Sequence, residues 1–197
     1  MGVSAYEKLG ALGGPSVGGG AWQLVTTIPS PYPGSVSSME VTGLGVDFQY
    51  YAVVGSNFQH SSGSAELRFL MGDSGGMQTG SGDYLWHRAM NDQDVSTYQS
   101  SIGFADDSIQ ISPGTTGTTT EPWGIDFVLY INTMRDSNNL PTAHGHYVYQ
   151  EGSNGDFSGG QIFGSVSNIA NMDRIGVEYA GTTIGEGRLS VYGIAHD

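Results

Sequence analysis

Apolar and polar residues alternate with a period of two along most of the chain. Side chains two residues apart lie on the same face of a β-strand, so this period predicts strands with one buried face. Such stretches are found at 22–28, 39–41, 48–54, 65–71, 84–88, 109–111, 123–131, 147–149, 162–163, 175–179 and 189–194. The clearest of them predicts a core strand whose inward side chains include Trp123, Ile125, Phe127 and Leu129.

No stretch repeats its apolar residues with the 3.6-residue period of a helix. Parallel strands need crossover connections, which are usually helices, so a parallel sheet is not expected. The pattern favours an all-β protein whose antiparallel sheets pack face to face as a sandwich, a jelly roll or a barrel. Two Gly- and Thr-rich stretches, 72–82 and 112–121, are predicted to be surface loops that either bind a partner or only connect strands.

The first twenty residues differ from the rest and are predicted to form an N-terminal arm, 1–20, attached to one domain, 21–197. Gly18-Gly19-Gly20 provides a flexible joint between the two. The arm lacks the long apolar run of a secretory signal or a membrane span. It is either an anchor or a frayed terminus without a role. Its candidate anchoring residues, which the short segment cannot bury, are Tyr6, Leu9 and Leu12.

Charge and composition narrow the possible partners. The 197 residues include 6 Lys and Arg against 19 Asp and Glu, a net charge of −13. Such a surface repels phosphates, so we expect no binding to nucleic acid and none to anionic membranes. Cysteine is absent, which excludes disulfides, thiolate metal sites and a cysteine nucleophile. Glycine accounts for 32 residues, about twice its usual share, which suits short strands joined by tight turns.

Two short motifs resemble reactive sites. His144 and His146 point to the same side of a predicted strand, and could hold a metal with a carboxylate such as Glu151 or Asp156, or could form an exposed polar face. The string Gly72–Gly76, GDSGG, resembles the surroundings of the nucleophile in trypsin-like proteases. That mechanism needs a histidine base held by a buried aspartate, and the sequence context supplies neither. A turn between two strands is the simpler interpretation.

Paired carboxylates and tryptophans also have simpler interpretations. The pairs Asp92/Asp94 and Asp106/Asp107 could bind calcium or hydrolyse a glycoside, but they fit solvated turns better. The three tryptophans lie in alternating stretches and are expected in the core, not as exposed platforms for sugars. We therefore predict no catalytic residue, no bound metal and no cofactor.

Six segments, in a fixed order, carry a resemblance to a known family: 21–25 AWQLV, 41–44 VTGL, 48–54 FQYYAVV, 65–76 AELRFLMGDSGG, 82–86 GDYLW and 187–194 GRLSVYGI. They are similar to segments of the jelly-roll virion proteins of tailed bacteriophages. The resemblance covers most of residues 21–197. One departure is Val191, which stands where the family usually has leucine.

This resemblance implies a jelly-roll β-sandwich that is not an enzyme and that assembles into virions in the host cytoplasm. Such proteins serve as capsid decoration or cement proteins, head fibres or tail-fibre modules, often as homotrimers. The implied partners are other copies of the chain and the major capsid protein or other virion proteins, with the arm as anchor. The alternative is a glycan-binding, lectin-like sandwich at the tip of a fibre, and a glycan hydrolase comes third because no site supports it.

Overall fold

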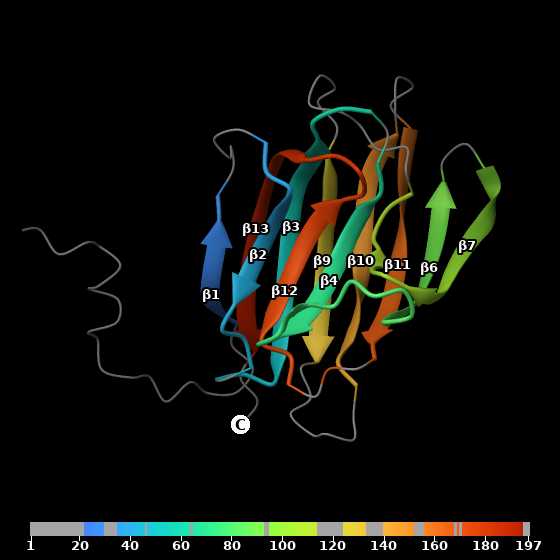
Figure 1. Cartoon of the computed structure of the whole chain (residues 1–197). Coiled ribbons are helices and arrows are strands. Elements are labelled where there is room, and N and C mark those ends of the chain that lie inside the picture. Colours follow the sequence, from blue (N-terminus) through green and yellow to red (C-terminus); the bar gives the residue numbers. More distant parts are fainter. Residues whose placement is uncertain are drawn as a thin grey trace, which may run out of the picture.

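The computed structural model describes residues 22–29, 35–45, 47–63, 65–92, 95–113, 124–132, 140–151, 156–167, 169 and 171–194. All regular elements within these ranges are strands, and they form two antiparallel sheets (Figure 1). The all-β class predicted from the period of two is therefore confirmed. The predicted arm, with Tyr6, Leu9 and Leu12, and the predicted core residue Trp123 lie outside the described residues.

The larger sheet has eight strands. Their order is β1 (Trp22–Ile28), β13 (Ile184–Ile194), β3 (Tyr50–His60), β9 (Ile125–Asn132), β10 (Thr142–Glu151), β11 (Asp156–Val166), β6 (Tyr84–Asp92) and β7 (Val95–Asp106). The smaller sheet contains β2 (Ser38–Thr42), β12 (Arg174–Tyr179), β4 (Leu67–Asp73) and β5 (Gly76–Met77), and β8 (Ile109–Gln110) pairs with β4. The first two strands therefore pair with the last two, because β1 lies beside β13 and β2 beside β12.

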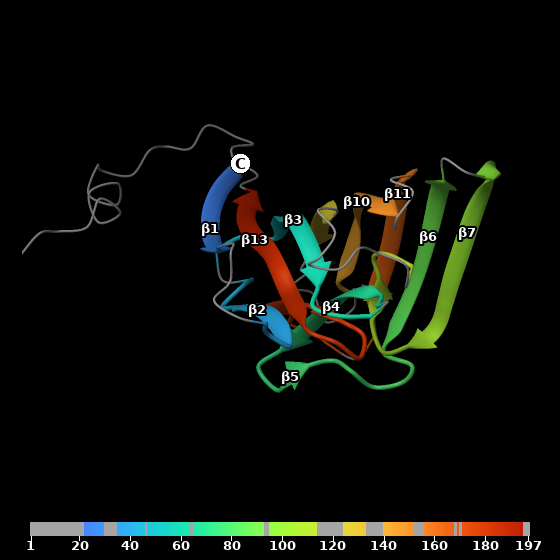
Figure 2. The ribbon, with the colours of Figure 1, turned by 90° about the horizontal axis from the view of Figure 1, so that it is seen from above.

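The smaller sheet covers one face of the larger sheet. In Figure 1 it lies in front, while β6 and β7 stand to the right of its labelled strands. Figure 2 shows the same arrangement from above, and no described strand lies over the opposite face of the larger sheet. That opposite face is called the outer face below.

The core fills the space between the sheets. On β9 the residues Ile125, Phe127, Leu129 and Ile131 are buried, while the residues between them are partly or fully exposed. They belong to the same apolar cluster as side chains of the smaller sheet, among them Phe69 and Val177. Tight packing of this kind is what the alternation of β9 requires, because only one of its faces meets the second sheet.

Tyr84 provides a polar link between the two sheets. Its hydroxyl accepts a hydrogen bond from the backbone N–H of Met71, at 2.8 Å, and donates one to the carbonyl oxygen of Met71, at 2.9 Å. Burial raises the pKa of Tyr84 well above its usual range. The link therefore keeps its proton under all ordinary conditions, and it fixes β6 of the larger sheet against β4 of the smaller one.

Candidate functional site

The outer face of the larger sheet can be followed row by row, because the registers of its seven strand pairs join into lines that cross all eight strands. The central row is Leu24, Tyr192, Ala52, Tyr130, His144, Phe163, His87 and Ile102. One flanking row is Trp22, Ile194, Tyr50, Asn132, Thr142, Ser165, Leu85 and Phe104. The other is Thr27, Ser190, Val54, Val128, His146, Gln161, Ala89 and Ser100.

These three rows contain no aspartate, glutamate, lysine or arginine. Charged residues make up 13% of the chain, so about three would be expected among twenty-four positions. The rows instead carry three of the five histidines and many apolar side chains. A chain with a net charge of −13 therefore keeps these three rows of the outer face free of carboxylates. This is the most distinctive feature of the described surface.

A groove of about 600 Å³ lies over β6, β7, β10 and β11 on this face. Leu85, Ile102, Phe104 and Phe163 line it together with His87 and His144. Phe104 is 77% exposed and Ile102 is 55% exposed. Large apolar side chains left this open, next to one another, are characteristic of surfaces that bind another molecule.

A smaller hollow of about 380 Å³ continues the outer face toward β3. Its walls are Val54, Val128 and Val148, with His146 beside them. Asp126 also lines this hollow. It lies two residues before Val128, on the same side of β9 but outside the three rows. The apolar character of the face is thus not confined to the groove at β7.

Trp22 lies on the outer face and not in the core, contrary to the expectation for the three tryptophans. Its side chain is 46% exposed. Its ring centroid lies 5.9 Å from that of Tyr130 and 5.7 Å from that of Tyr192. Between those two tyrosines the register places Ala52, whose small side chain is completely buried. The expectation for Trp22 is wrong because alternation gives the phase of a strand but not which of its faces is covered.

Trp86, in contrast, is only 6% exposed, as expected. Its indole lies against Gly103 of β7, where a Cβ atom would overlap it. The indole N–H donates a hydrogen bond to Asp106, at 3.0 Å. The guanidinium carbon of Arg88 lies 5.7 Å from the ring centroid. Trp86 is therefore a packing residue that holds β7 onto β6.

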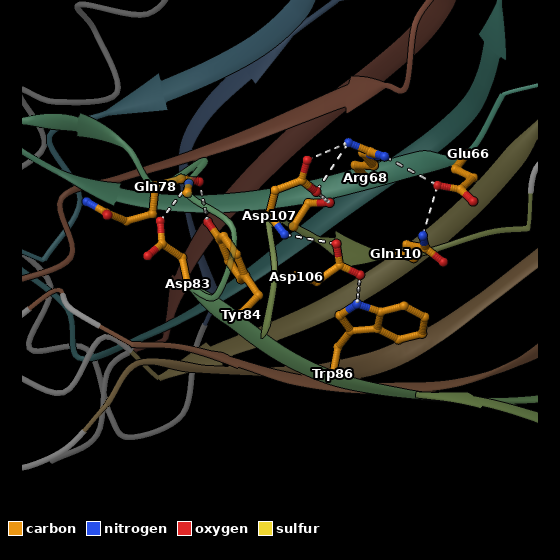
Figure 3. Close-up of polar contacts among 11 residues, drawn as sticks. Glu66, Arg68, Gln78, Asp83, Tyr84, Trp86, Asp106, Asp107 and Gln110 are labelled. Carbon is orange, nitrogen blue, oxygen red and sulfur yellow. Dashed lines mark hydrogen bonds and ion pairs between the residues drawn. The ribbon is translucent and has the colours of Figure 1, made fainter. Parts of the chain in front are cut away.

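The remaining candidate sites have structural roles. In the string Gly72–Gly76, the N–H of Gly75 donates to Asp73 at 2.8 Å within the β4–β5 hairpin, which is the predicted turn. Asp107 forms an ion pair with Arg68 at 3.2 Å, and Glu66 lies 3.5 Å from the same guanidinium (Figure 3). The carboxylates of Asp106 and Asp107 are thus engaged within the protein, with Trp86 and Arg68 respectively. Asp94 lies outside the described residues.

His144 and His146 are both exposed on the outer face, as strand geometry predicts. No group of three or more His, Asp or Glu side chains in the described part of the chain is placed to hold a metal ion. The described ranges also contain no helix of the length and apolarity that crossing a bilayer requires.

Comparison with known proteins adds no homologue: no protein-family model, curated protein or solved structure matches the chain. Function must therefore be inferred from the outer face and from the sequence pattern.

Proposed function

We propose that the protein is a non-enzymatic structural protein of a bacteriophage virion, a capsid decoration or cement protein that covers the particle surface as a homotrimer. The observation that carries this proposal is the set of three uncharged rows on the outer face, with their open apolar groove, on a strongly acidic chain. Large apolar side chains exposed next to one another mark surfaces that bind other proteins. Acidic copies can pack side by side only where their carboxylates do not meet.

The sequence resemblance supplies the virion context, and the fold is compatible with it. Two antiparallel sheets in which the first strands pair with the last suit a jelly-roll sandwich. The copy number and location of the protein in purified particles test the proposal directly. Hundreds of copies on the head mean decoration, whereas a dozen or fewer at the tail mean a fibre.

The proposed anchor is the N-terminal arm. We expect that deletion of residues 1–17 leaves a folded, soluble domain that no longer joins particles, because the first described strand begins at Trp22. The measurement is co-sedimentation of the truncated and full-length proteins with particles that lack the protein. A matched control replaces Tyr6, Leu9 and Leu12 by serine and keeps the length. Equal binding of the truncated and full-length proteins would show that the arm is not the anchor.

Glycan binding is a second candidate, favoured by the exposed ring of Trp22 beside Tyr130 and Tyr192. Aromatic faces next to polar groups are suited to stacking against sugars. If this function holds, Trp22→Ala should weaken binding to a glycan of the host surface at least tenfold without unfolding the protein. Phe157→Ala is the control, since Phe157 is exposed but outside the three rows. If neither the wild-type protein nor particles that carry it bind to a glycan array, glycan binding is ruled out as the function.

A further inference from the structure

We propose that copies of this chain join edge to edge, with β7 of one copy pairing antiparallel to β1 of the next. The larger sheet would then continue from one molecule into its neighbour. This inference deepens the proposed function and rests on its claim of self-association, but it does not depend on the place of the protein in a particle.

Both proposed edges have an open side among the described residues. β1 pairs there only with β13, and β7 only with β6. The backbone N–H and C=O groups along the other side of each strand can therefore accept a further strand. On β1 the residues Trp22, Leu24 and Val25 are all more than 40% exposed, so this edge leaves apolar surface open to a partner.

Neither β1 nor the segment Gln99–Phe104 of β7 carries a charge or a proline that would block pairing. Natural edge strands are blocked by lysine, by proline or by other charged side chains. Gln99–Phe104 of β7 stays in unbroken register with β6 and contains no charged residue and no proline. The seven residues of β1 contain none either, although one bulge lies between Leu24 and Thr26. In the smaller sheet, by comparison, edge strand β2 carries Glu40.

Strand direction favours contact between unlike edges. All seven pairs of the larger sheet are antiparallel, so the first and the eighth strands, β1 and β7, run in opposite directions. A copy rotated about an axis along the strands therefore presents β1 antiparallel to β7 of its neighbour. Such a head-to-tail contact can close into a ring, and three copies would give the proposed trimer. Pairing of β7 with β7 would stop at a dimer.

The distribution of charge favours the same contact between β7 of one copy and β1 of the next, called the joint below. The central row of the outer face ends in Leu24 at one edge and in Ile102 at the other, so the joint would bring apolar side chains together. The three uncharged rows would then continue from copy to copy. For a chain with a net charge of −13, these edges bring two copies together with few carboxylates facing one another.

Cysteine cross-linking tests this contact between copies. The chain has no cysteine of its own, so only introduced thiols can react. Gln23→Cys places a thiol on β1 and Gln99→Cys places one on β7, both at exposed positions. In the register that continues the three rows, Gln23 would lie opposite Gly103, four residues from Gln99 along β7. At about 3.3 Å per residue this is about 13 Å, so the bis-maleimide cross-linker should span about 16 Å. We expect cross-linked dimers when the two single variants are mixed, none from either variant alone, and trimers from the double variant.

A lysine substitution tests the same contact by disruption. Ile102→Lys places a charge on the open edge, whereas the control Leu85→Lys places it in the same groove one strand further in. Edge pairing predicts at least a tenfold weaker association for Ile102→Lys and a clearly smaller effect for Leu85→Lys. Equal effects would show that copies stack through the face instead. Unchanged unfolding midpoints confirm that both variants are folded.

The possible failures can be told apart. If light scattering shows the full-length wild type to be a monomer at every concentration, the self-association in the proposed function is wrong. If the wild type is oligomeric but Gln23→Cys and Gln99→Cys never cross-link, only the edge contact is wrong. Cross-linking of Gln99→Cys with itself would replace the head-to-tail contact by a twofold one.

Discussion

Replacing Phe127 by alanine is expected to lower the free energy of unfolding by about 3–5 kcal/mol, the range found for large-to-small changes in a core. The Phe127 side chain is only 2% exposed. Its ring lies 5.5 Å from that of Phe58 and covers Gly55 of the neighbouring strand. β9 has a paired strand on each side, so the backbone cannot collapse into the space that the ring leaves.

Chemical denaturation of the two proteins measures this loss. The control is Val128→Ala, because Val128 is the next residue of β9 and points to the outer face, where it is only partly buried. We expect the control to cost less than about 1 kcal/mol, since little apolar area is lost from contact. A loss below 1 kcal/mol for Phe127→Ala itself would mean that the ring does not fill the core as described.

The sequence pattern is clearest for a strand with one covered face. β9 alternates without interruption because its inner side meets the second sheet and its outer side does not. The sequence pattern predicts no strand at β7. It lies at an edge of the sheet, where Ile102 and Phe104 are exposed and Gly103 has no side chain. Residues Gln99–Phe104 of β7 bury too little for their sequence to alternate clearly, whereas the opposite edge strand, β1, does alternate. The two-residue strand β5, inside a predicted loop, is too short to show a period.

The outer face could not be predicted in this way, for a different reason. Its three rows combine residues from eight strands that are far apart in the sequence, and they become visible only with the registers. Local alternation places His144, for example, on one side of β10, but it does not say that Phe163 of β11 and Tyr130 of β9 stand next to it. Long-range pairing decides this, and no short motif encodes it. The absence of charged residues from the three rows could therefore not be predicted from local sequence patterns.

The same packing around Phe127 predicts a coupled effect at Gly55. In the register Gly55 lies directly opposite Phe127, and a Cβ atom at Gly55 would overlap the phenyl ring. Gly55→Ala should therefore cost about 1–3 kcal/mol, as expected for overpacking a tight core. Gly176→Ala is the control, because the closest atom to a Cβ there would be the flexible end of Met77, at 3.1 Å.

The decisive measurement is a double-mutant cycle. If the cost of Gly55→Ala arises from the ring, it should nearly vanish in a Phe127→Ala background, where the new methyl group occupies part of the vacated space. The coupling between the two substitutions should then exceed about 1 kcal/mol, beyond what independent sites show. Additive costs would mean that Gly55 is required for another reason, such as its contact with β13 on the other side. Because both residues lie on the inner face, neither substitution should change the outer face or the assembly that we attribute to it.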